Sequence, residues 1–143
     1  MIHQTDVVVI GTGPVGLFSI FECGMLRLKC HAFDSLDQVG GQCAALYPEK
    51  PIYDIPAHPT ILGGELAANL ERQAAPFHPT YHLKEQVQSI EALDDQGKSW
   101  RLTGSQGTVV ETKAIIIAAG VGAFGPNRPP LENIENFEKT CVH

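Results

Sequence analysis

The chain has 143 residues, which is enough for one domain around one hydrophobic core, and its composition (43% apolar, 18% charged) is that of a globular protein. The net charge is −6 and no run of Lys or Arg occurs, so neither nucleic acid nor anionic membrane is an expected partner. The uncharged stretch 7–21 is broken by glycines and a proline and is shorter than the roughly 20 apolar residues of a membrane span. No basic segment precedes it, so we expect neither a signal peptide nor a membrane helix.

A strand, a helix and a second strand are predicted at the start of the chain. Residues 6–10, Asp-Val-Val-Val-Ile, form a β-branched run typical of a strand buried on both faces of a parallel sheet. Apolar residues in 14–25 predict a buried helix that could end at Gly24. Residues 31–33 then predict a second strand that leads to Asp34. Together these elements make one βαβ unit.

A long irregular segment and a second helix follow. Residues 35–60 are rich in Gly and Pro, and so long a stretch without regular structure is more often functional than filler. A stripe at spacings of three and four then predicts a helix: Leu62, Leu66, Leu70, Gln73 and Phe77. Pro76 is expected to stop this helix.

The spacing of apolar residues changes from helical to strand-like in the last third of the chain. Turn sequences separate three predicted strands, near residues 86–93, 99–103 and 108–113. We interpret them as an antiparallel meander, and residues 114–119 as another buried parallel strand. The expected fold is therefore α/β, with a Rossmann-like parallel sheet plus an antiparallel β-meander.

A glycine-rich turn joins the first strand to the first helix. Residues 11–16 match G-x-G-x-x-G in the strand–turn–helix context that gives this motif its meaning. Gly11 permits the tight turn, Gly13 lets the backbone approach a pyrophosphate, and Gly16 lets helix and strand pack closely. Pro14 suits the first helical turn, because its missing N–H is not needed there. Free N–H groups and the helix dipole would then hold the anion.

Asp34 narrows the choice of ligand. It lies 18 residues after Gly16, at the end of the second strand, where a carboxylate accepts hydrogen bonds from ribose hydroxyls and repels a 2′-phosphate. No Lys or Arg follows before Lys50. We therefore predict FAD or NAD, not NADP, at this site. The meander favours FAD, because NAD domains usually continue with alternating strands and helices.

Residues 39–56 carry a specific resemblance. Their sequence, Val-Gly-Gly-Gln-Cys-Ala-Ala-Leu-Tyr-Pro-Glu-Lys-Pro-Ile-Tyr-Asp-Ile-Pro, closely resembles ferredoxin–NADP⁺ reductases of the thioredoxin-reductase-like type. Residues 62–77 and 118–124 are also similar to that family, and the resemblance covers essentially the whole chain. It implies a cytoplasmic, homodimeric flavoprotein whose FAD takes hydride from NADPH and exchanges single electrons with ferredoxin or flavodoxin.

The resemblance also implies roles for individual residues. Asp34 would bind the adenosine ribose, Gln42 would hydrogen-bond the cofactor, and Tyr47 would stack on the isoalloxazine ring. Val87 would contact the adenine through its backbone, and Phe124 would lie close to the cofactor. The whole predicted cofactor-binding set is Gly11, Gly13, Pro14, Gly16, Asp34, Gln42, Tyr47, Val87 and Phe124. No catalytic residue and no metal ligand are predicted.

The chain departs from the family in length. The resemblance ends where the family begins its NADPH-binding domain. We expect residues 1–122 to be the N-terminal part of an FAD-binding domain and residues 123–143 to lead towards a missing NADPH-binding domain. The isolated residues 1–143 should therefore not reduce a flavin with NADPH.

Two alternative functions stay open. One is the FAD domain of a thioredoxin reductase, whose C-x-x-C lies in the NADPH domain; residues 47–50, Tyr-Pro-Glu-Lys, favour the ferredoxin enzyme instead. The other is a dinucleotide-binding module without catalysis. A yellow protein on purification would favour the flavoprotein over an NAD-binding module.

The cysteines and histidines are expected to have structural roles. The cysteines, Cys23, Cys30, Cys43 and Cys141, form no C-x-x-C pair, which is consistent with free thiols in a reducing cytoplasm. Cys43 lies shortly after Gly40-Gly41, near where disulfide reductases place a redox cysteine. The position five residues on, where its redox partner would be needed, holds Pro48, so we expect Cys43 to line a pocket or to pack. His78 and His82 have a zinc-like spacing without further ligands, so no metal site is expected.

Overall fold

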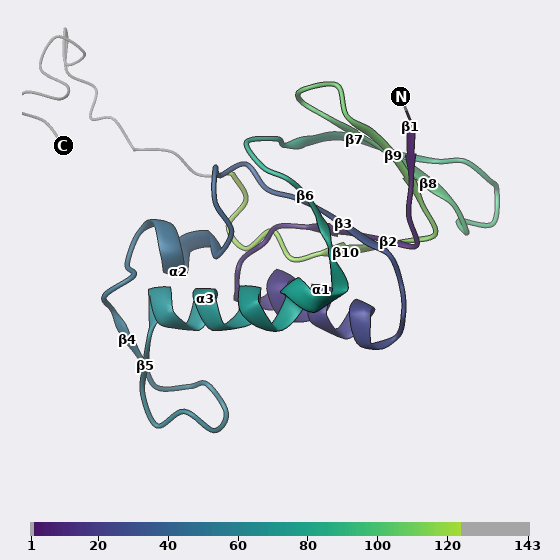
Figure 1. The fold of residues 1–143 in the computed structure, drawn as a ribbon. Coiled ribbons are helices and arrows are strands. Elements are labelled where there is room, and N and C mark those ends of the chain that lie inside the picture. The colour runs from purple at the N-terminus through teal and green to yellow at the C-terminus, as the bar shows by residue number, and fades with distance from the viewer. Residues whose placement is uncertain (1, 124–143) are drawn as a thin grey trace, which may run out of the picture.

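The computed structural model of the protein describes residues 2–123 (Figure 1). Its first sheet is parallel throughout, in the order β10 (Ala114–Ile117), β2 (Val7–Ile10), β3 (Cys30–Phe33) and β6 (Thr80–His82). The second sheet has the order β1 (Ile2–Gln4), β9 (Val109–Thr112), β8 (Trp100–Gly104) and β7 (Val87–Ala92). Strands β7, β8 and β9 form an antiparallel meander, and β1 joins β9 in parallel. The predicted fold class is therefore confirmed.

Helices cover one face of the parallel sheet. Helix α1 (Pro14–Met25) connects β2 to β3 and packs beside α3 (Gly63–Ala74), which a short 3-10 helix (Ala75–Phe77) extends. Figure 1 shows both helices on one side of the parallel sheet, with the second sheet beyond its other face. The predicted βαβ unit, β2–α1–β3, is present.

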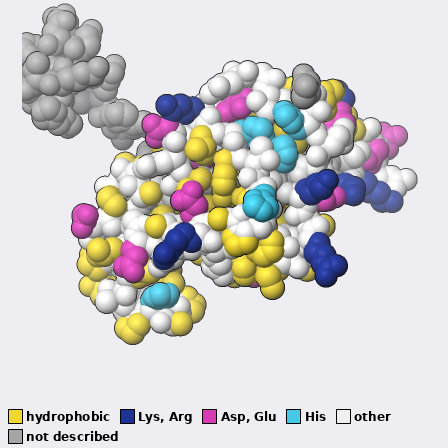
Figure 2. Space-filling model, in the orientation of Figure 1, with side chains coloured by type: hydrophobic (Ala, Val, Ile, Leu, Met, Phe, Trp, Pro, Cys, Tyr) yellow, Lys and Arg dark blue, Asp and Glu magenta, His cyan; other side chains and the backbone are white. Residues whose placement is uncertain are grey.

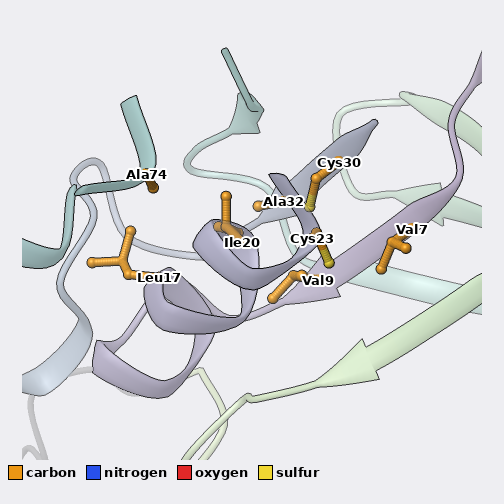
Figure 3. Packing of buried hydrophobic residues seen from close by; sticks show 8 residues of the cluster. All are labelled: Val7, Val9, Leu17, Ile20, Cys23, Cys30, Ala32 and Ala74. Carbon is orange, nitrogen blue, oxygen red and sulfur yellow. The ribbon is translucent and has the colours of Figure 1, made fainter. Parts of the chain in front are cut away.

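The core has two halves, one on each face of the parallel sheet. On the helical face, side chains from β2, α1, β3 and α3 pack together (Figure 3): Val7, Val9, Leu17, Ile20, Cys23, Cys30, Ala32 and Ala74. On the other face, Val8 and Phe33 pack against Leu102 and Val110 of the meander. Because alternate residues of β2 point to opposite faces, its sequence is apolar throughout. Complete burial of each such side chain contributes about 1.5–3 kcal/mol.

Helix α1 differs from the prediction at its end. It continues through Gly24 to Met25, and the chain leaves it at Arg27, which has a φ of 59°. Gly24 serves packing instead, because a Cβ there would lie 2.1 Å from Cγ of Phe77.

Other differences concern short or exposed elements. Residues 35–60 are not wholly irregular, since they contain α2 (Gly41–Ala45) and β4 (Pro51–Ile52), which pairs with β5 (Ile61–Leu62). The prediction of a parallel strand at residues 114–119 is confirmed for Ala114–Ile117, but the prediction that it is buried is wrong. Ala114, Ile117 and Ala119 are exposed, Ile117 to 72%, and the other three residues are only partly buried, because β10 is an edge strand. Strand β1 was not predicted. None of the helices within residues 2–123 has the length and apolar character needed to cross a membrane.

Candidate functional site

A cavity of about 580 Å³ opens at the carboxyl ends of β10, β2 and β3. Parallel α/β sheets bind their ligands at this position, because the strand-to-helix loops converge there. The lining residues come from segments 10–15, 33–36, 41–47, 85–87 and 118–123. Segments far apart in the sequence therefore share one wall.

Two glycines of the 11–16 turn are required by the protein itself. Gly11 has a φ of +96°, and a Cβ there would lie 2.4 Å from the carbonyl oxygen of Ala118. A Cβ at Gly16 would lie 1.9 Å from the carbonyl oxygen of Gly11. A side chain at Gly11 would collide with the backbone that follows β10, and one at Gly16 would force the first helix away from the glycine-rich turn.

Gly13 is different, because nothing in the described fold requires it to be glycine. Its φ of −65° and ψ of −177° suit any residue, and an added Cβ would meet only the Cα of Gly41, at 4.0 Å. The residue lines the cavity. A glycine here keeps the cavity wall open for a ligand that touches the backbone, as a pyrophosphate does in this motif.

The N-terminus of α1 faces the same cavity. Pro14 and Val15 line it, and no side chain from the described residues caps the helix. The N–H groups of the first helical turn have no partner within an α-helix, and they carry the positive end of the helix dipole. This end of the cavity can therefore hold an anion.

Asp34 is held in place by the glycine-rich turn. Its Oδ2 accepts hydrogen bonds from the Thr12 N–H (2.7 Å) and the Thr12 hydroxyl (2.6 Å), and its Oδ1 accepts one from the Leu36 N–H (3.0 Å). A carboxylate offers about four acceptor positions, so one remains for a ligand hydroxyl. Sequence reasoning missed Thr12, because the middle position of G-x-G carries no residue preference that indicates a side-chain contact.

Helix α2 brings Gln42 into the cavity wall. Gly40 and Gly41 have φ values of +108° and +57°, and the Gly40 N–H donates to the Thr12 carbonyl oxygen at 2.8 Å. A Cβ on Gly41 would lie 2.9 Å from the Cα of Gly13, so the two glycine-rich turns touch directly. Gln42 and Tyr47, which follow, both line the cavity.

The Tyr47 side chain has two polar neighbours. The ammonium nitrogen of Lys50 lies 5.2 Å from the centre of the Tyr47 ring, within cation–π range. Burial raises the pKa of the Cys43 thiol, although the Lys50 charge and a hydrogen bond with Tyr47 oppose the rise. Cys43 thus lines the cavity as a protonated thiol at neutral pH, which argues against nucleophilic chemistry there.

Most of the predicted site residues come together in this cavity. The lining includes Gly11, Gly13, Pro14, Asp34, Gln42, Tyr47 and Val87. Gly16 lies behind it, against the backbone of Gly11, and Phe124 lies outside the described residues.

Glu85, a buried lining residue, was missed because one acid before a strand has no distinctive sequence pattern. Within residues 2–123 no group of three or more His, Cys, Asp or Glu is arranged to hold a metal ion.

No family model matches the chain, but curated proteins do. It is 59% identical over 140 residues to "Ferredoxin--NADP reductase" of Rhodospirillum rubrum, covering 97% of this chain and 41% of that protein. The proteins of the same name from Rickettsia akari and Paramagnetospirillum magneticum are 58% and 56% identical, each match covering 98% of this chain and 41% of the relative. The chain thus spans 41% of the length of these relatives.

Solved structures share the fold at lower identity. A thioredoxin reductase from Streptococcus pyogenes superposes with a TM-score of 0.70 at 21% identity, over 94% of this chain and 40% of that one. A steroid monooxygenase bound to NADP superposes with a TM-score of 0.71 at 24% identity, over 92% of this chain and 29% of that one. The open form of cyclohexanone monooxygenase superposes with a TM-score of 0.70 at 26% identity, over 90% of this chain and 30% of that one. The sequence comparison is more specific than these fold similarities: the chain is similar to curated ferredoxin–NADP reductases at 56–59% identity, over 41% of their length.

Proposed function

We propose that this chain binds FAD in the cavity and, as part of a longer protein, passes electrons between NADPH and ferredoxin or flavodoxin. The observation that carries the proposal is the open space at Gly13, beside the uncapped N-terminus of α1. The names of relatives that are 56–59% identical support the reductase activity.

Each part of FAD has a candidate partner in the cavity wall. The pyrophosphate would lie against Gly13 and the first turn of α1, and Asp34 would accept hydrogen bonds from the adenosine ribose. The backbone of Val87 would contact the adenine, while Gln42 and Tyr47 would hold the isoalloxazine end, with the Tyr47 ring as an aromatic wall. Bound FAD supplies the hydride and one-electron chemistry, and the residues of this chain orient it and limit its contact with water.

The larger protein would supply what this chain does not contain. We propose that residues 1–122 form the N-terminal part of the FAD-binding domain and that residues 123–143 lead to an NADPH-binding domain. An acidic ferredoxin needs a basic docking face, and 10 Lys and Arg against 16 Asp and Glu make this chain a poor source of one. We further propose that the complete protein is a cytoplasmic homodimer, and that residues 1–143 alone do not oxidise NADPH.

A matched pair of glycine variants tests FAD binding. Gly13→Ala places a methyl group in the open space, so we expect the thermal midpoint to stay near that of the wild type while FAD affinity falls by about tenfold or more. Gly16→Ala should lower the thermal midpoint, because its Cβ meets the Gly11 carbonyl oxygen at 1.9 Å. The readouts are quenching of flavin fluorescence on titration and thermal unfolding.

Two results would contradict the proposal. One is a wild-type chain that remains folded and fails to bind FAD. The other is a Gly13→Ala chain that binds FAD with unchanged affinity, since the pyrophosphate could not then lie against this backbone.

A further inference from the structure

Glu85 is a buried acid in the cavity wall. Glu85 lies between β6 and β7, only 4% of its surface is exposed, and it lines the cavity together with Gln86 and Val87. Its N–H donates to the carbonyl oxygen of Asp34 at 2.8 Å. The pairing of β3 with β6 thus continues beyond the strands and places Glu85 next to the residue proposed to bind the ribose.

The two carboxylate oxygens of Glu85 have different surroundings. Oε1 accepts hydrogen bonds from the N–H groups of Gln106 and Thr108, both at 3.1 Å, and so closes the turn between β8 and β9. Gly104 leaves room for this contact, because a Cβ there would lie 2.2 Å from Oε1. By contrast, Oε2 receives no hydrogen bond from the part of the chain that the structure describes.

The hydrogen bonds to the turn between β8 and β9 explain the position of Oε1 but not that of Oε2. Water in the cavity still reaches Oε2, which is not among the buried side-chain atoms left without a partner. A ligand that displaces this water without offering a hydrogen-bond donor would incur the free-energy cost of desolvating the oxygen, so a ligand that fills this part of the cavity is expected to carry a donor there. The phosphates of FAD carry negative charge and cannot supply one. The adenosine half can, through the 6-amino group of adenine or a ribose hydroxyl, and both of these would lie near Asp34 and Val87 in the proposed arrangement.

We propose that Oε2 of Glu85 accepts a hydrogen bond from the adenosine half of the cofactor and thereby helps to determine nucleotide specificity. This inference rests on the proposed FAD site. Together with Asp34, Glu85 places two carboxyl groups at this end of the cavity, so a 2′-phosphate would meet both.

Glu85→Gln separates the binding role from the structural one. The glutamine carbonyl can keep the two hydrogen bonds to Gln106 and Thr108, while an NH₂ group, a donor, replaces Oε2. Calorimetric titrations of the wild-type and variant 143-residue chains would use FAD, ADP, inosine diphosphate (no 6-amino group) and 2′-deoxy-ADP (no 2′-hydroxyl). Glu91→Gln makes the same change of charge at an exposed position of β7 and is the matched control. Thermal unfolding checks that each variant folds.

We expect Glu85→Gln to weaken FAD and ADP binding by about tenfold, and Glu91→Gln to leave it unchanged. The wild type should prefer ADP to one of the two analogues, and Glu85→Gln should lose that preference. Loss of the preference over inosine diphosphate identifies the amino group as the donor, and loss of the preference over 2′-deoxy-ADP identifies the hydroxyl.

Two outcomes would overturn the inference. One is a Glu85→Gln chain that binds every nucleotide as the wild type does. The other is a Glu85→Gln chain whose affinity falls by the same factor for all four nucleotides, which would mean that Glu85 acts only through the fold. A wild type that binds neither FAD nor ADP would instead refute the proposed function, and this inference with it.

Discussion

Mild acid should destabilise this fold through a cluster of three histidines. His3 of β1, His31 of β3 and His82 of β6 meet where the two sheets adjoin, and His31 Nδ1 lies 3.0 Å from His82 Nε2. The ring of His3 lies 5.6 Å from that of His31 and 5.9 Å from that of His82, between centroids. In Figure 2 histidine side chains gather on the face turned to the viewer. Protonation would place like charges within this group.

The pKa shifts give the direction and the pH window. Burial, followed by the proximity of His82 and His3, lowers the pKa of His31 from 6.5 to about 4. Burial also lowers the pKa of His82, while Glu85 opposes the shift and His3 adds to it. Between pH 6.5 and about 4, the ordinary and the lowered pKa of His31, the unfolded chain binds more protons than the folded one. The contribution to stability is therefore complete above about pH 6.5 and is lost as the pH falls towards about 4.

The size of the effect follows from the same values. A fall in the pKa of His31 from 6.5 to about 4 corresponds to at most about 3 kcal/mol. Because solvent reaches these half-buried rings, we expect about 1–2 kcal/mol. Hydrogen bonds lower the pKa of Asp6, Asp94 and Glu111, and the contribution of such carboxyl groups is lost only at lower pH.

Urea unfolding of the wild type and of His31→Asn, from about pH 7.5 to about pH 4.5, measures this contribution. The free energy of unfolding of the wild type should fall more steeply between about pH 6.5 and about pH 4.5 than that of the variant. His58→Asn, a change in an exposed loop outside the cluster, is the control and should follow the wild type. Equal slopes for the wild type and His31→Asn would refute the assignment.

Two further predictions concern the core and the glycine-rich turn. Leu102→Ala should lower the free energy of unfolding by about 2–5 kcal/mol in urea titrations, because Leu102 is fully buried against Phe33 and Val110; a loss below about 1 kcal/mol would mean that the sheets do not pack as described. Thr12→Val should weaken FAD binding by about tenfold in fluorescence titrations, since Asp34 loses a hydrogen bond from the hydroxyl, whereas Thr12→Ser should bind as the wild type does; equal losses in both variants would contradict this role.

The sequence predicted the elements whose signals are local. The apolar run of β2, the glycine-rich turn and the acid at position 34 lie within one βαβ unit, so spacing alone indicated their arrangement. The missed features depend on distant partners. Strand β1 exists through its pairing with β9, more than 100 residues away, and Thr12 and Glu85 act through residues about 20 positions distant. Ile117 was predicted to be buried because an apolar run does not indicate which strand forms the edge of a sheet.

Edge strand β10 has a consequence for handling the protein. Within residues 2–123 it pairs only with β2, so its other side presents unpaired backbone groups beside three consecutive isoleucines without a charge. Such an edge is a template for strand addition between molecules, since the strand itself contains no lysine or proline and the one charge beside its start is Lys113. Concentrated solutions of these residues should therefore aggregate through this strand before the core unfolds.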